Sequence, residues 1–216
     1  MKNLIFFLLI LPIFCYSQKI NQLDNNLKQG LWKKNFSNGN TRYEGTFKDG
    51  VEVGIFKFYY KSGELKAVKE FFHKGNAAAT HIYDKKGVLK ASGIYVNKQK
   101  DSTWNYYNGD EVLISSEQYT SGRLDGFTRT YYDDGTLYEM KHWKDGNENG
   151  EWKQYYKSGN LIMSTTYVDG NLDKSFTYYY PDGKINFIGN YNNNSRVGEW
   201  IYYKETGVQD TLIYYD

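Results

Sequence analysis

Residues 150–173 read GEWKQYYKSGNLIMSTTYVDGNLD, and this pattern recurs in register every 24 residues from Gly30 onward. With the first residue of each unit counted as position 0, glycine dominates positions 0 and 9, tryptophan or phenylalanine position 2, tyrosine position 5, leucine position 11 and an aromatic residue position 17. A fixed period of this kind indicates a repeat architecture. The sequence therefore predicts eight repeats over residues 30–216, numbered 1 to 8 and beginning at Gly30, Gly54, Ala78, Ser102, Gly126, Gly150, Lys174 and Gly198.

Each repeat has the pattern of a β-hairpin. In repeat 6, residues 151–156 are rich in strand-favouring aromatic side chains, and residues 160–168 form a second apolar stretch. Between them, Lys157-Ser158-Gly159 suits a type I turn that ends on a left-handed glycine. A further turn, Asp169-Gly170, leads toward the next repeat. Because such connections are too short for parallel crossovers, we expect sixteen antiparallel strands in an array about 75 Å long.

The fold class is therefore all-β, an elongated array of antiparallel hairpins with aromatic side chains on both faces. We expect the tyrosines of position 5 to lie opposite the leucines of position 11, with the aromatic residues of position 17 on that same face. Alternation then places the tryptophan and phenylalanine residues of position 2 on the other face. Two forms are open: a single curved sheet held by aromatic ladders between repeats, or a solenoid of hairpins closing on a narrow core. Residues 18–29 contain no complete repeat, and with Leu23 at position 17 they form an N-terminal cap.

The first 17 residues have the pattern of a secretory signal peptide. A lysine precedes an apolar run over residues 4–14, which is shorter than the roughly 20 residues of a membrane-spanning helix. Cys15 and Ser17 form a small-x-small site, so we expect cleavage after Ser17 and a mature chain that is periplasmic or secreted. The alternative is a lipoprotein acylated at Cys15, in which Phe14 occupies a place where a lipobox has a small residue.

Composition and motifs give no indication of catalysis, a metal or a cofactor. The net charge of +2 comes from interspersed charges, and nucleic-acid binding needs a clustered basic face. The three histidines, His73, His81 and His142, occupy unrelated repeat positions, so they do not suggest a zinc site. Acidic pairs such as Asp133-Asp134 lie where turns choose aspartate for its geometry. We therefore expect a protein that is not an enzyme.

Two stretches carry a family resemblance. Gly54-x-Phe56-x-x-Tyr59-Tyr60-x-x-Gly63-x-Leu65 and the matching residues 150–161 resemble the MORN-repeat variant. Proteins with such arrays are often grouped as YwqK-type antitoxins of toxin–antitoxin systems, and the resemblance covers residues 20–216. It implies a hairpin array that contacts a partner, and it carries over no catalytic residue. Repeats 3 and 4 depart from the motif, with Ala78, Thr80, Ser102 and Glu111 in the key columns.

The column at position 2 is the candidate ligand-binding surface. Two interpretations remain open: the rings pack on their neighbours, or they form a regularly spaced platform for a protein or a glycan. Short aromatic repeats of similar appearance occur in choline- and cell-wall-binding modules, which rely on aromatic cages. A lipid surface is a further reading, disfavoured by the nearly neutral charge. The last strand, Thr211–Asp216, is open to pairing with another copy. The candidate site residues are Trp32, Phe56, Trp104, Trp152, Phe176 and Trp200.

Overall fold

The structure is a computed structural model that describes residues 19–216. The predicted signal peptide, its cleavage site after Ser17 and the alternative lipid site at Cys15 lie outside the described residues. In the described part of the chain, no helix is of a length and apolarity that would let it cross a membrane.

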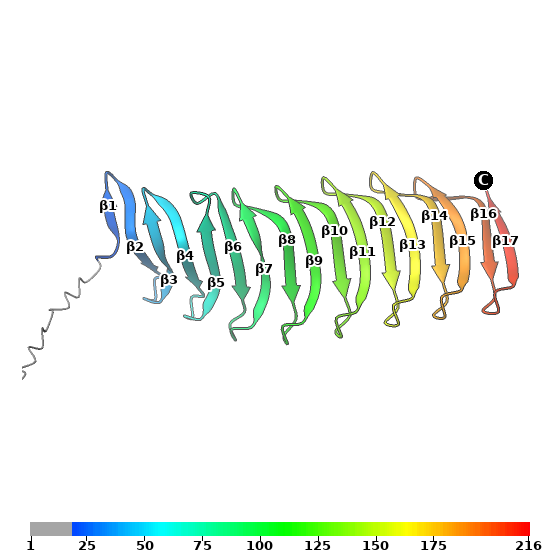
Figure 1. Cartoon of the computed structure of the whole chain (residues 1–216), viewed down its shortest axis with the longest axis horizontal. Helices are drawn as coiled ribbons and strands as arrows, with labels where there is room; N and C mark the ends of the chain where they lie inside the picture. Colours follow the sequence, from blue (N-terminus) through cyan, green and yellow to red (C-terminus); the bar gives the residue numbers. More distant parts are fainter. Residues whose placement is uncertain (1–18) are drawn as a thin grey trace, which may run out of the picture.

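Seventeen strands form one open sheet in which every strand pairs antiparallel with its neighbours in the chain (Figure 1). The prediction of an all-β hairpin array is confirmed, in the form of a single sheet. The first nine strands are β1 (Gln22–Asp24), β2 (Leu27–Asn35), β3 (Thr41–Lys48), β4 (Val51–Tyr59), β5 (Leu65–Phe72), β6 (Ala77–Tyr83), β7 (Leu89–Val96), β8 (Gln99–Tyr107) and β9 (Leu113–Thr120). The other eight are β10 (Arg123–Tyr131), β11 (Leu137–Lys144), β12 (Asn147–Tyr155), β13 (Leu161–Val168), β14 (Asn171–Tyr179), β15 (Ile185–Asn192), β16 (Ser195–Tyr203) and β17 (Gln209–Tyr215).

The turn inside each repeat has the predicted geometry. In repeat 6, the backbone N–H of Tyr156 donates to the carbonyl of Asn160 over 2.8 Å, and the N–H of Gly159 donates to the carbonyl of Tyr156 over 2.9 Å. Gly159 has φ +89°, in the left-handed region that glycine enters without steric cost. The turn pairs Tyr155 with Leu161, which confirms that the tyrosine and leucine columns face each other.

The turn between repeats is of the two-residue kind that matches the twist of a hairpin. Asp169 and Gly170 both have positive φ, 49° and 83°, as a type I′ turn requires. The N–H of Gly170 donates to the carbonyl of Glu148 one hairpin earlier, over 2.8 Å. Except between β5 and β6, where the connection spans residues 73–76, this turn therefore ties each repeat to the one before it in addition to reversing the chain.

A second tyrosine ties the repeats together at the opposite end of the strands. The hydroxyl at position 6 donates to the backbone carbonyl of position 5 in the next repeat, as in the 2.8 Å bond from Tyr180 to Tyr203. The same bond joins Tyr60 to Tyr83, Tyr132 to Tyr155 and Tyr156 to Tyr179. In repeats 3 and 4, Asp84 and Asn108 stand at position 6, and their side chains accept N–H groups of their own turns instead.

Position 0 lies inside a strand, whereas the sequence pattern suggested a strand that begins after it. Gly54 has φ +65° in the middle of β4, where Glu44 pairs with Lys57 and Thr46 pairs with Val53. Residues 54–56 therefore stand opposite Gly45 alone, which is a β-bulge that bends the strand. All the position-0 residues except Ala78 share this positive φ.

The predicted placement of the position-17 aromatic residues is wrong. Tyr167 pairs with Gly150 and Thr165 pairs with Trp152, so positions 17 and 2 share a face. The cause is a register shift between Gln154 and Tyr155, because one extra residue in the second strand reverses the alternation beyond the turn. We call the face that carries positions 2, 4, 13, 15 and 17 the ladder face, and the face that carries positions 1, 3, 14 and 16 the back face.

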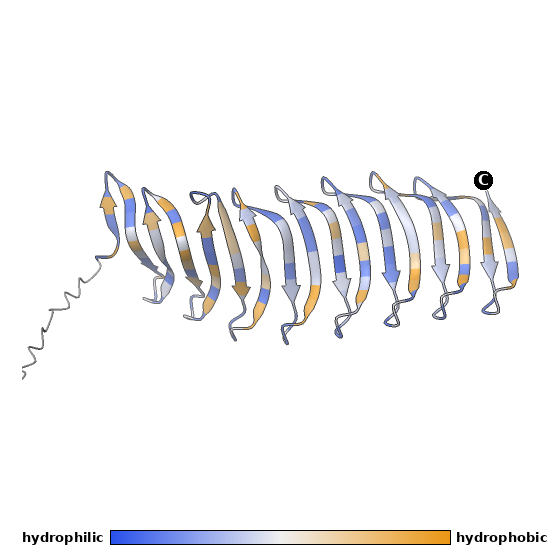
Figure 2. Ribbon diagram, in the orientation of Figure 1, coloured by the Kyte–Doolittle hydropathy of each residue, from blue (hydrophilic) through white to orange (hydrophobic). Residues whose placement is uncertain are grey.

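The core of this one-layer protein is a line of rings along the ladder face. Figure 2 shows hydrophobic and hydrophilic residues alternating along most strands, with no uniformly apolar layer. Phe56 stands edge-on between Phe47 and Phe71, with ring centroids 5.1 and 5.2 Å apart, and Trp200 stands in the same way between Tyr191 and Tyr215. Edge-to-face pairs contribute about 0.5–1.5 kcal/mol each beyond the area they bury. The expected aromatic ladder between neighbouring repeats is therefore present.

The N-terminal segment covers the start of the array. β1 pairs with β2 from Gln22↔Gln29 to Asp24↔Leu27, and the carbonyl of Gln22 accepts a 3.1 Å hydrogen bond from the indole of Trp32. Leu23, in the position-17 place, remains 60 % exposed. The segment thus occupies the edge of β2 as a short strand.

Candidate functional site

The position-2 column divides into buried and half-exposed rings. Phe56, Trp104 and Trp200 are at most 1 % exposed, so they are closed to a ligand. Trp32, Trp152 and Phe176 are half-buried and keep part of their surface accessible. Trp152 and Phe176 belong to adjacent repeats, whereas Trp32 is at the far end of the array. A binding role for this column stays a prediction, and it falls on those three residues.

The residue at position 15 of the preceding repeat decides whether a ring is buried. Gly45, Gly93 and Gly189 hold that position before Phe56, Trp104 and Trp200. A Cβ added to any of these three glycines would come within 3.0 Å of the following ring. The ring therefore lies directly on the backbone of the preceding repeat, and only glycine leaves room for it.

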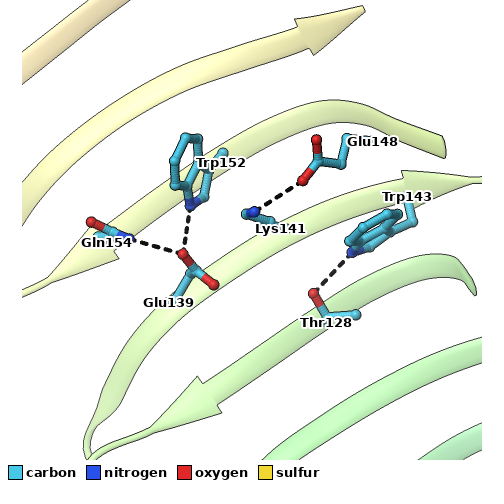
Figure 3. Close-up of polar contacts among 7 residues, drawn as sticks. All are labelled: Thr128, Glu139, Lys141, Trp143, Glu148, Trp152 and Gln154. Carbon is cyan, nitrogen blue, oxygen red and sulfur yellow. Dashed lines mark hydrogen bonds and ion pairs between the residues drawn. The ribbon is translucent and has the colours of Figure 1, made fainter. Parts of the chain in front are cut away.

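At Trp152, where position 15 of the preceding repeat is Lys141, polar groups hold the ring instead (Figure 3). The ammonium group of Lys141 lies 4.5 Å from the ring centroid of Trp152 and 2.9 Å from a carboxylate oxygen of Glu148. Glu139 accepts hydrogen bonds from the indole of Trp152, at 2.8 Å, and from the amide of Gln154, at 2.9 Å. The nearby ion pair raises the pKa of Lys141 against the opposing effect of burial.

Repeats 3 and 5 have threonine at position 2 in place of a ring, and the surroundings of the two threonines differ. At Thr128 the hydroxyl accepts a 2.9 Å hydrogen bond from the indole of Trp143, which stands at position 17 where other repeats have tyrosine or phenylalanine (Figure 3). At Thr80, which is 1 % exposed, the hydroxyl donates a 3.4 Å hydrogen bond to the carbonyl of Ala78, and the residue lines a hollow. The interruption in repeat 3 therefore leaves a cavity.

This cavity lies between the strands of repeats 2 and 3 and is lined by residues such as Lys69, Thr80 and Tyr95. It measures about 520 Å³, within the range of small-molecule sites, and a second hollow of about 420 Å³ adjoins it. Phe58, Lys69 and Tyr95 line both of them. We call the two together the repeat-3 cavity. β5 and β6 pair without a register shift here, from Ala67↔Ile82 to Phe72↔Ala77, so the bulge found in other repeats is missing.

Lys69 is the one charged side chain that lines both parts of the repeat-3 cavity. It is half-buried, and its ammonium group lies 4.3 Å from the ring centroid of Tyr95 and 5.9 Å from that of Phe58. Burial lowers its pKa, and the charge of Glu52 opposes that effect only partly. Within residues 19–216 the ammonium makes neither a hydrogen bond nor an ion pair. Sequence reasoning treated repeat 3 only as a break in the column and missed this lysine.

The histidines and the acidic turn residues lie at the surface, in turns or against neighbouring rings. His81 is exposed, His73 lies in the turn between β5 and β6 with φ 49°, and the ring of His142 packs edge-on against Phe127. Asp134 accepts hydrogen bonds from the backbone and hydroxyl groups of Thr136, which lower its pKa. Among the described residues no three His, Cys, Asp or Glu side chains gather as a metal site would need.

The comparisons with known proteins bear on the fold. Four segments match the family model described as MORN repeat variant, residues 28–49, 52–74, 148–169 and 172–193. No curated protein matches the sequence. Among solved structures, the chain is similar to a crystal structure of TcdB2–TccC3–Cdc42, at 15 % identity and a TM-score of 0.21, over 84 % of this chain and 12 % of that one. It is also similar to a crystal structure of TcdB2–TccC3, at 16 % identity and a TM-score of 0.23, with the same coverage.

The four matched segments coincide with the hairpin units of the sheet. Residues 28–49 and 52–74 run through β2 to β5, and residues 148–169 and 172–193 run through β12 to β15. The unmatched repeats continue the same strand order and the same 24-residue spacing. These four segments of the chain are therefore MORN repeats of the variant type.

Proposed function

We propose that this chain is an exported, non-catalytic scaffold that recognises a partner protein through its ladder face. The observation that supports it is a single sheet face on which half-exposed aromatic rings recur along the array. Cations stack over several of these rings, namely Trp32, Tyr95, Tyr119 and Trp152. Aromatic and arginine side chains dominate the energetics of protein interfaces. MORN repeats are binding modules for proteins and lipids, which fits this reading.

The chemistry of the ladder face favours recognition over turnover. Around Trp152 the charged groups are bound to each other and to the ring, as Glu139, Lys141 and Glu148 are (Figure 3). A nucleophile or general base needs a reachable group that is free to exchange a proton. Repetition offers a different advantage, because weak contacts made at regular spacing add up when the target matches that spacing.

The test compares the two faces of the sheet. Tyr178 and Tyr202 pack against Phe187 on the ladder face, at centroid distances of 5.3 and 5.4 Å. Ile55 and Tyr214 are 58 % and 70 % exposed on the back face. We expect Tyr178→Ser with Tyr202→Ser to abolish capture of a purified partner, while Ile55→Ser with Tyr214→Ser leaves it intact. Loss of capture in the back-face variant alone, with both variants folded by far-UV circular dichroism, would overturn the assignment.

Glycan recognition is the second candidate, favoured by the half-exposed rings of Trp152 and Phe176 in neighbouring repeats. The test is binding of the mature protein to isolated cell wall. Loss of that binding in the Trp152→Leu, Phe176→Leu double variant, with binding kept in a folded Trp200→Leu control, would establish glycan recognition. Binding to liposomes in the same assay would point to lipid instead. Turnover of any substrate that a single polar substitution removes would refute the non-catalytic reading.

Export is tested separately. From the pattern of Cys15 and Ser17 we expect the mature chain to begin at Gln18, which intact-mass measurement of the protein recovered from its native host decides. A lipid adduct on Cys15, or an unprocessed cytoplasmic chain, would contradict the proposal that the protein acts as a freely exported scaffold.

A further inference from the structure

Lys69 and Lys141 stand at the same place in their repeats, and their surroundings differ in two ways. Both occupy position 15, and seven residues later Lys141 has Glu148 whereas Lys69 has Asn76. At position 2 of the next repeat, Lys141 has Trp152 whereas Lys69 has Thr80. The third neighbour is common to both, because Tyr95 and Tyr167 hold position 17 of that next repeat.

Around Lys141 the chain itself supplies a carboxylate and a ring. Glu148 accepts a 2.9 Å charge-assisted hydrogen bond, and the ring of Trp152 lies 4.5 Å from the ammonium. Around Lys69 both are missing, and the space that they would fill is the repeat-3 cavity, lined by Thr80 in one part and by Asn76 in the other. The cavity therefore lies where the carboxylate and the ring would stand.

The charge of the cavity decides between ligand classes. Its lining includes Arg42, Lys66 and Lys98 at the exposed rim in addition to Lys69, and Glu52 is its single acid. A cationic ligand of the kind held by aromatic cages would be repelled. Arg42, Lys66 and Lys98 are exposed, so solvent and salt screen their charges. The half-buried ammonium of Lys69 balances one negative charge, whereas a phosphate dianion calls for several donors in a fork or a backbone nest.

We propose that the repeat-3 cavity binds a ligand that carries one carboxylate and one aromatic ring, taking the places that Glu148 and Trp152 occupy around Lys141. Two sources present this chemistry: a polypeptide that ends in an aromatic residue, and a free aromatic acid. The carboxylate meets the ammonium of Lys69, and the ring lies against Phe58 and Tyr95. This proposal rests on the proposed binding role of the ladder face, and it adds the chemical class of the ligand that one site on that face binds.

The experiment is calorimetric titration of the chain with N-acetyl-tryptophan, with its neutral amide, and with an octapeptide ending in tryptophan whose C-terminus is either free or amidated. The acid should bind about tenfold or more tightly than the amide, as expected for one charge-assisted hydrogen bond. Tighter binding of the free-ended octapeptide than of the amino acid identifies a polypeptide end as the source. Binding of the amino acid alone identifies a small acid.

Three variants locate the site. Lys69→Met removes the charge and keeps the apolar stem, and Asn76→Glu keeps the lysine but gives it an internal counter-ion, so each should weaken acid binding about tenfold or more. Lys141→Met, the matched control, should leave binding unchanged. Equal binding of acid and amide, no binding of either acid probe, or full binding in both Lys69→Met and Asn76→Glu would overturn the proposal. Partner capture by the ladder face is measured in a separate experiment. A failure of the proposed function can therefore be told apart from a failure of the proposed ligand site.

Discussion

Replacing Gly189 by alanine should lower the free energy of unfolding more than adding a methyl group at a glycine with open surroundings. The new Cβ would come within 3.0 Å of the indole of Trp200, which is 0 % exposed and stands between Tyr191 and Tyr215. The ring has no free space to enter, so the overlap must be relieved by strain or by loss of its packing. Overpacking of a filled core costs about 1–3 kcal/mol, and complete loss of a large buried side chain about 3–5 kcal/mol. We expect a loss of about 2–3 kcal/mol.

Urea unfolding followed by far-UV circular dichroism gives the overall effect, and hydrogen exchange shows where it falls. Because stability in a repeat array sums over neighbouring units, protection should drop in β15 to β17 and stay unchanged in β2 to β5. Gly109→Ala is the matched control, since Gly109 has no atom within 4 Å of the added Cβ and no positive φ. That variant should change stability by less than about 0.5 kcal/mol.

A double-mutant cycle isolates the contact between the methyl group and the indole. In a Trp200→Thr background, which copies the natural threonine at position 2 of repeats 3 and 5, the alanine meets no ring and its cost should largely vanish. If Gly189→Ala costs the same with and without Trp200, the effect belongs to the backbone of β15. The account of buried rings in terms of position 15 would then be refuted.

Three further outcomes follow from the turns, the tyrosine bonds and the titration of the half-buried Tyr59 hydroxyl. Gly159→Val should destabilise by about 1–3 kcal/mol because a β-branched residue is strained at φ +89°, whereas Lys157→Val should be nearly neutral; equal midpoints in urea would refute the turn assignment. Tyr180→Phe removes a 2.8 Å hydrogen bond to the next repeat and should cost about 0.5–1.5 kcal/mol, detected as faster amide exchange in β16; unchanged exchange would contradict the role of this bond. Burial, with a 2.7 Å hydrogen bond to Glu44, raises the pKa of Tyr59 to about 12 from 10, so its contribution to stability is complete below pH 10 and is lost as the pH rises toward 12. The stability of Tyr59→Phe should therefore fall less steeply over that interval, and parallel curves would speak against it.

The period of the sequence predicts the strands and turns because each depends on neighbouring residues of one repeat. The pairing of Tyr155 with Leu161 and the left-handed Gly159 follow from the turn motif alone. The face of Tyr167 does not, because it depends on a register shift between Gln154 and Tyr155 that adds one residue to the second strand. Counting alternation through a bulge gives the wrong side.

The candidate site was harder to predict because it depends on residues from more than one repeat. Whether a position-2 ring is buried is decided by the residue at position 15 of the preceding repeat, glycine before Trp200 and lysine before Trp152. A column read one position at a time shows six similar rings. Comparing position 15 with position 2 of the next repeat would have found both the buried rings and the unfilled place at Thr80.

The tyrosine bonds at position 6 also divide the array into cooperative units. They join repeats 5 to 8 in an unbroken series, and a separate bond joins repeat 2 to repeat 3. Asp84 and Asn108 interrupt the series on either side of repeat 4, where their side chains close their own turns. Opening of the sheet should therefore need less free energy around repeat 4 than within repeats 5 to 8, and Phe36 at position 6 of repeat 1 leaves the same gap before repeat 2. We expect repeats 2 and 3 and repeats 5 to 8 to move as two stiff units joined by a more flexible repeat 4. The repeat-3 cavity lies on the first of these units, next to repeat 4.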